Sequence, residues 1–179
     1  MVNFGFDFRK LIGPVVAAVV VALAATGIPR NAAADLGQPS GKVILTVSGK
    51  ISQTNVGDEA RFDRAMLEEI GMQTMKTSNP FETGMHTFEG ILLNDLLQRV
   101  GATGETLVAY ALDGYAIEIP VSDATTYPVL LALIWNGREM GVRNKGPIWV
   151  IYPIDAFEEL KDEEFSSRSI WQLERIVVE

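Results

Sequence analysis

Alternating apolar and polar residues predict strands near residue 45 and through the second half of the chain. Residues 42–49 (KVILTVSG) alternate in this way, and so do several later segments bounded by turn residues. The later predicted strands are residues 106–112, 115–121, 129–135, 146–153 and 169–178. The pairs Asp113-Gly114 and Asn136-Gly137 are strong tight-turn signals. Each therefore predicts a turn beside a strand.

Two segments have the apolar spacing of helices. In the first, apolar side chains recur at every fourth position: Phe62, Met66 and Ile70. Asp58 is a suitable N-cap for this helix, and Gly71 ends it. The second helix is predicted by a leucine-rich stripe over residues 92–100. The acidic residues 156–164 indicate a short helical turn.

Residues 72–88 show neither the alternation of a strand nor the apolar spacing of a helix. Because they also include Pro80 and Gly84, a long functional or mobile loop is predicted there.

Apolar residues make up 47% of the 179-residue chain, enough for one domain with a core. The order of elements predicts a single α+β domain, in which a strand-dominated mixed sheet or barrel-like core carries a few short helices.

The first 34 residues have the pattern of a secretory signal peptide. Arg9 and Lys10 precede an apolar run over residues 11–25, and small residues lead to Ala34. An uncleaved membrane anchor is the alternative, but the run is shorter than the roughly 20 residues of a spanning helix. We therefore expect cleavage near Ala34 and a mature, periplasmic domain over residues 35–179.

Composition excludes several kinds of chemistry. The net charge of −8 argues against nucleic-acid binding. The chain has no cysteine and a single histidine, His86, so thiolate and multi-histidine metal sites are excluded. No nucleophile-elbow pattern surrounds a serine, and the paired carboxylates lie in runs typical of solvated faces.

The three tryptophans indicate binding of a flat ligand more than they indicate catalysis. Trp135, Trp149 and Trp171 each lie in or beside a predicted strand, with basic residues nearby in the sequence. Aromatic faces and a few polar groups suit a planar heterocycle. The alternative is that the indoles fill a core. That alternative is favoured for Trp135, whereas both remain open for Trp149 and Trp171.

Five segments, taken in order, resemble the molybdopterin-binding domain of the sulfite oxidase family over about residues 42–178. They are FEGILLNDLLQRVGA, ALDGYAIEIPVSD, LLALIWNGREM, GPIWVIYP and SSRSIWQLERI. The resemblance implies that family's fold and a site for a pterin cofactor. Enzymes of the family hold molybdenum through a cysteine in the loop that corresponds to residues 72–88, which has none here. Trp149 replaces a strand arginine, and Ile170 replaces a lysine before Trp171.

As a cysteine-free, exported protein with these segments, the chain resembles periplasmic pterin-binding regulators. That resemblance implies a metal-free pterin as ligand, in preference to molybdopterin. It also implies a partner: the periplasmic part of an inner-membrane enzyme of cyclic-di-GMP metabolism. Trp149 is expected to stack on the pterin, and the other expected ligand contacts are Trp171, Ser78, Asn79, His86, Arg143 and Arg168.

Two other readings stay open. One is a molybdopterin-dependent oxidoreductase of the sulfite oxidase fold with an atypical, cysteine-free metal site. The other is a structural or assembly domain that has lost ligand binding. Bound molybdenum would support the former, and a bound pterin alone would support the regulatory reading.

Overall fold

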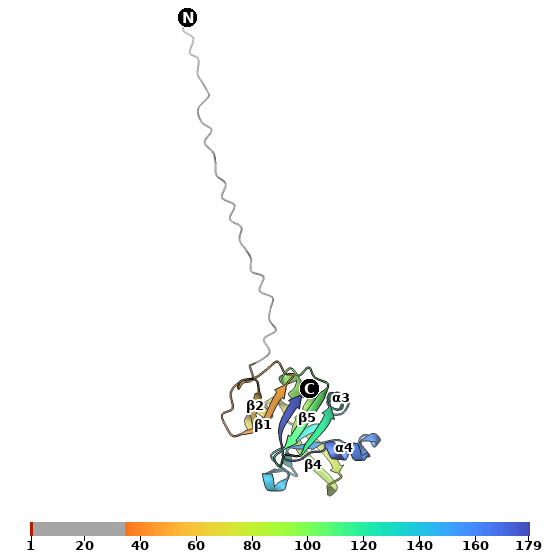
Figure 1. Ribbon diagram of the computed structural model, residues 1–179. Helices are drawn as coiled ribbons and strands as arrows, with labels where there is room; N and C mark the ends of the chain where they lie inside the picture. Colours follow the sequence, from red (N-terminus) through yellow and green to blue (C-terminus); the bar gives the residue numbers. More distant parts are fainter. Residues whose placement is uncertain (2–34) are drawn as a thin grey trace. The chain divides into compact units, whose positions relative to one another are not determined.

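Two five-stranded sheets form the body of the molecule. The computed structural model describes Met1 and residues 35–179, so the predicted signal peptide lies almost wholly outside the described residues. Residues 35–179 belong to one compact unit. The fold is strand-dominated α+β with short helices, as the sequence predicted (Figure 1).

The first sheet has the strand order β2-β1-β10-β5-β6. Its strands are β1 (Val43–Gly49), β2 (Ala60–Asp63), β5 (Thr106–Ala111), β6 (Ala116–Pro120) and β10 (Leu173–Val178). Figure 1 shows blue β10 between orange β1 and green β5. The β1–β10 pair is parallel, with Thr46 opposite Arg175, and the other pairs are antiparallel. The last strand therefore completes the sheet beside the first.

The second sheet has the order β3-β4-β7-β8, and β9 also pairs with β7. Its strands are β3 (Gln73–Asn79), β4 (Glu82–Leu92), β7 (Leu130–Trp135), β8 (Arg138–Glu139) and β9 (Trp149–Ile151). All its pairs are antiparallel. Gly90 permits the close approach of β4 and β7, because a Cβ there would collide with the Leu131 backbone.

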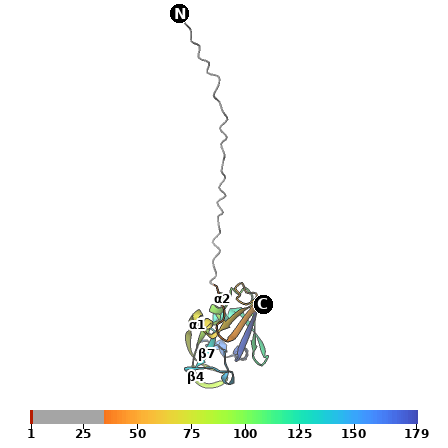
Figure 2. The same ribbon diagram turned by 90° about the vertical axis from the view of Figure 1, so that its left-hand side faces the viewer.

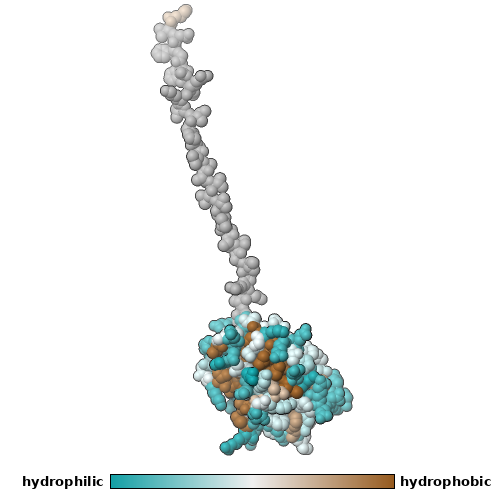
Figure 3. All heavy atoms as spheres, in the orientation of Figure 1, coloured by the Kyte–Doolittle hydropathy of each residue, from teal (hydrophilic) through white to brown (hydrophobic). Residues whose placement is uncertain are grey.

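Short helices surround the sheets. They are α1 (Arg64–Gly71), α2 (Leu93–Arg99), α3 (Val121–Thr126), α4 (Glu163–Arg168) and the 3₁₀ turns η1 (Val142–Asn144) and η2 (Glu158–Lys161). Helices α1 and α2 contact each other and β4 (Figure 2). Hydrophilic residues gather over the η2–α4 segment, at the right of Figure 3. None of the helices described is long and apolar enough to cross a bilayer.

Two predicted elements are corrected by the structure. Asp58 does not begin a helix, because it lies in the turn of a small β-bridge between Val56 and Glu59. The helix begins after Asp63, at the end of β2. Residues 72–88 are not a loop, because most of them form the β3–β4 hairpin. Its edge strand β3 is largely solvent-exposed near its start, so no apolar alternation marks it in the sequence.

Buried apolar residues form two clusters. The larger one includes Leu45, Phe62 and Ile148 and extends between the sheets and helices α1 and α2. The smaller one lies on the other face of β7 and β9, and its buried members are Phe88, Leu130, Ala132, Met140, Trp149 and Ile151. Both faces of β9 are therefore buried, including the face that carries Trp149.

Asp63 is expected to make the free energy of unfolding decrease at low pH. One carboxylate oxygen accepts the Met66 N–H at 3.0 Å, and the other accepts the Gly41 and Ser40 N–H groups at 2.7 and 2.8 Å. These bonds, that of Met66 foremost, lower the pKa of Asp63 below its ordinary value of 3.8. The stabilisation by the ionised carboxylate is fully present at pH values above the ordinary pKa. It is lost as the pH falls through the lowered pKa.

Urea unfolding of the parent and of Asp63→Asn, repeated from neutral to acidic pH, tests this role. The parent should lose stability in acid more steeply than the variant, which has no carboxylate to protonate at this position. Parallel pH profiles for the two proteins would show that Asp63 does not contribute.

Candidate ligand-binding site

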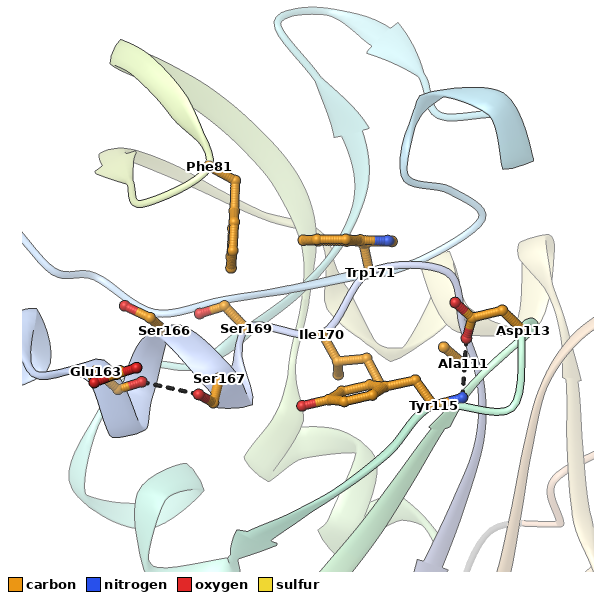
Figure 4. Close-up of a pocket in the computed structure, with 10 residues that line it drawn as sticks. All are labelled: Phe81, Ala111, Asp113, Tyr115, Glu163, Ser166, Ser167, Ser169, Ile170 and Trp171. Atoms are coloured by element: carbon orange, nitrogen blue, oxygen red, sulfur yellow. Dashed lines mark hydrogen bonds between the residues drawn. The ribbon is translucent and has the colours of Figure 1, made fainter.

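A pocket of about 410 Å³ lies where four segments meet. The β3–β4 turn contributes Phe81, the β5–β6 hairpin contributes Ala111, Asp113 and Tyr115, and the remainder comes from α4 and the chain after it (Figure 4). The lining residues from α4 onward are Glu163, Ser166, Ser167, Ser169, Ile170 and Trp171. The pocket thus draws on both sheets and on the connection into the last strand.

Aromatic rings form much of the wall. Phe81 and Trp171 meet edge to face, with ring centroids 4.9 Å apart and an interplanar angle of 87°. Tyr115 lies on the other side of Ile170 from Trp171 (Figure 4). Phe81 and Tyr115 are 39% and 48% exposed, unusually high for such large apolar side chains. Exposed aromatic rings around a concave site are a common feature of ligand pockets.

The polar groups of the wall are hydroxyls and carboxylates. Asp113 lies in the Asp-Gly turn, and its Oδ1 accepts the Tyr115 N–H at 2.9 Å, which orients the carboxylate. The Ser167 hydroxyl donates to the Glu163 backbone carbonyl at 3.1 Å, within α4. Figure 4 shows Asp113 and Glu163 at opposite ends of the pocket. None of the lining residues is Lys, Arg or His.

The predicted stacking residue Trp149 lies in the core and not on the pocket wall. Its side chain is 0% exposed, and its Nε1 donates to the Ser169 carbonyl at 3.1 Å. Phe88 and Trp135 meet it at steep angles, with ring centroids 5.5 and 5.7 Å away. Trp149 lies on the face of β9 opposite Ile148, which belongs to the larger cluster. The second face is buried too, because the smaller apolar cluster covers it.

The predicted polar contacts Ser78 and Asn79 lie at the end of β3 and bond within the protein. The Ser78 N–H and hydroxyl both donate to Asp155, and these bonds lower the pKa of that carboxyl group. Asn79 Oδ1 accepts the N–H groups of Phe81 and Glu82 at 2.9 and 3.0 Å, which shapes the hairpin turn. Asn79 Nδ2 is buried and finds no partner among the described residues.

His86 lies on β4, away from the pocket. Asn136 Oδ1 accepts the Thr87 N–H at 2.9 Å, so its Nδ2 is the group that faces His86 Nδ1 at 3.0 Å. The other ring nitrogen of His86 is Nε2. That nitrogen is buried without a partner in the described part of the chain. The ring lies 5.4 Å from that of Trp135.

The two predicted arginines do not line the pocket either. Arg143 is exposed in η1. Arg168 ends α4, and its guanidinium pairs with Asp123 at 3.0 Å and also with Glu164. Of the ligand contacts expected from the sequence, the pocket therefore includes Trp171 alone. Sequence reasoning missed Phe81, Asp113 and Tyr115, although the Asp-Gly turn before Tyr115 was recognised as a turn.

Comparison with known proteins gives one family match. Residues 59–158, just over half of the chain, match the family described as the oxidoreductase molybdopterin binding domain. The match runs from the bridge before β2 to the start of η2, and it ends before α4 and Trp171. No curated protein matches the sequence significantly.

Proposed function

Since the chain belongs to the oxidoreductase molybdopterin-binding domain family, we propose that it is a non-catalytic member that binds a metal-free pterin. We propose further that this binding regulates a partner: the periplasmic part of an inner-membrane enzyme of cyclic-di-GMP metabolism. The lining of the site supports the first statement, and the second extends the resemblance described above.

The residues present do not fit the family's molybdenum group. The chain has no thiolate to bind the metal. No group of three His, Asp or Glu side chains that could hold a metal occurs in the part of the chain that the structure describes. The pocket presents Asp113 and Glu163, whose negative charges would repel the phosphate of molybdopterin.

The basic residues nearest this site are already engaged elsewhere. Arg168 pairs with Asp123 and Glu164, and Lys145 pairs with Glu82 at 3.2 Å. Bringing a phosphate into the pocket would therefore require breaking an existing ion pair or burying an unneutralised anion. This charge pattern favours a ligand without phosphate.

One observation carries the pterin proposal: aromatic rings and carboxylates line the same pocket. A pterin is a flat ring whose amino and ring N–H groups are hydrogen-bond donors. Ionised carboxylates are acceptors only, so Asp113 or Glu163 matches that edge of the ring. Trp171 and Tyr115 supply the aromatic surface for its faces.

Calorimetric titration of the purified protein with dihydroneopterin, a reduced pterin without phosphate, tests the proposal. We expect binding at one site, and at least tenfold weaker binding by Trp171→Ala, a difference of about 1.4 kcal/mol. Stacking contributes about 0.5–1.5 kcal/mol beyond the apolar area buried, so the loss is of the right size. Trp135→Phe is the matched control, because that ring is outside the pocket, and it should bind as the parent does.

Two further measurements separate the alternatives. Dihydroneopterin triphosphate should bind more weakly than dihydroneopterin, because the pocket contains carboxylates and no cation. Elemental analysis should find no stoichiometric molybdenum. One molybdenum per chain would support the oxidoreductase reading, and absence of both metal and pterin binding would support a domain without a ligand.

The regulatory role needs its own test. Deleting the gene should change the cellular cyclic-di-GMP concentration, and the Trp171→Ala protein should fail to restore it. An unchanged concentration after deletion would refute the signalling role and leave the pterin-binding proposal intact.

A further inference from the structure

Lys145 places an ammonium group beside two indole rings. Its Nζ lies 4.7 Å from the ring centroid of Trp171 and 5.1 Å from that of Trp149. Both distances are within the range of cation–π attraction. Glu82, at the start of β4, holds the same ammonium at 3.2 Å. The lysine side chain is largely buried, at 23% exposure, so the surrounding charges and rings constrain it.

The ammonium contacts Trp171 without being part of the pocket wall. Trp171 lines the pocket, whereas Lys145 and Glu82 do not. Phe81 meets the Trp171 ring nearly at right angles, and both rings lie at the wall of the cavity (Figure 4). The Trp171 indole thus contacts a cation and also borders the cavity.

The backbone fixes Lys145 in this place. It follows η1 in the left-handed region at φ 65°, and its carbonyl oxygen accepts the N–H of Gln172 at 3.0 Å. The Gln172 side chain in turn donates to the Val142 carbonyl at 2.7 Å. The η1 loop is therefore bonded to the residue next to Trp171, and Glu82 connects the β3–β4 hairpin to the same point.

We infer that Lys145 is a positioning residue, which holds the Trp171 indole in the orientation that stacks on the ligand. The inference rests on the proposed function only where it concerns the ligand. Without the ammonium, the indole loses the cation–π attraction that favours this orientation. Ligand binding must then also order the ring, which costs free energy, and the affinity for the ligand falls.

Replacement of Lys145 by Met, which keeps a long unbranched side chain but removes the charge, tests the inference. We expect Lys145→Met to bind dihydroneopterin about fivefold to tenfold more weakly with little change in melting temperature. Lys145→Arg keeps the charge and should bind within about twofold of the parent, since a guanidinium also makes cation–π contacts. In a Trp171→Ala background, Lys145→Met should have no further effect on affinity. An equal loss in both backgrounds would overturn the inference, because Lys145 would then act independently of Trp171.

A second measurement needs no ligand. In protein labelled with 5-fluorotryptophan, the ¹⁹F resonance of Trp171, assigned from Trp171→Phe, should be single and narrow in the parent and in Lys145→Arg. It should broaden or split in Lys145→Met. If the parent binds no dihydroneopterin, the proposed function fails while this spectrum still decides the positioning role. An unchanged Trp171 resonance in Lys145→Met would overturn that role.

Discussion

Replacing Trp149 by alanine is expected to lower the free energy of unfolding by about 3–5 kcal/mol, the range for truncating a large buried aromatic residue. The ring is fully buried in the smaller apolar cluster, and the indole also donates a hydrogen bond to the Ser169 carbonyl. Alanine leaves a cavity in this cluster and an unpartnered carbonyl. Denaturant unfolding, extrapolated to water, measures the loss.

Trp149→Phe and Trp171→Ala are the matched controls for this prediction. Phenylalanine keeps most of the apolar volume at position 149 and loses the hydrogen bond, so its effect should be intermediate. Trp171 is only half-buried, so its removal should cost much less stability and act mainly on ligand binding. If Trp149→Ala has the parent's stability but binds pterin poorly, Trp149 belongs to the ligand site after all.

The contrast between these tryptophans shows what the sequence could and could not predict. Alternation along residues 146–153 puts Trp149 on the face opposite Ile148 and Val150, and the structure has them in different clusters. It could not reveal that both faces of β9 are buried, because the covering residues Phe88 and Met140 come from other segments of the chain. A strand buried on both faces carries apolar residues at every position, so alternation no longer distinguishes core from site.

The β3–β4 hairpin was missed for the opposite reason. Strand β3 is an edge strand whose first residues, Gln73 and Thr74, are solvent-exposed, so they need not be apolar. The hairpin is specified by its pairing with β4, for example Thr77 with His86, which no local pattern records. Strands with a buried face, such as β1 and β5, were predicted to within about two residues.

The charged groups of the site could not be assigned from sequence proximity. Arg168 lies three residues before Trp171, which suggested a ligand contact. In the fold its guanidinium faces Asp123, 45 positions earlier in the chain. The pocket carboxylate Asp113 comes from a turn recognised only as a connection between strands. Such pairings depend on which segments meet, and a single sequence does not specify them.

Asp123→Ala is expected to lower the free energy of unfolding by about 3–5 kcal/mol, as when one partner of a buried ion pair is removed. The Asp123 and Arg168 side chains are 8% and 12% exposed. Asp123 Oδ2 accepts hydrogen bonds from both the Arg168 guanidinium, at 3.0 Å, and the Tyr152 hydroxyl, at 2.8 Å. Burial, then the charge of Asp123, raises the pKa of Tyr152, so this hydroxyl remains a donor at neutral pH.

Tyr152→Phe removes only the neutral hydrogen bond and should cost about 1 kcal/mol, which makes it the matched control for Asp123→Ala. The ion pair also holds the end of α4, the helix that supplies Ser166 and Ser167 to the pocket wall. In the temperature range where it is still folded, Asp123→Ala should therefore bind dihydroneopterin more weakly than Tyr152→Phe does. Denaturant unfolding and calorimetric titration of both variants decide the point. If Asp123→Ala were no less stable than Tyr152→Phe, the ion pair would not be what fastens α4 to the domain.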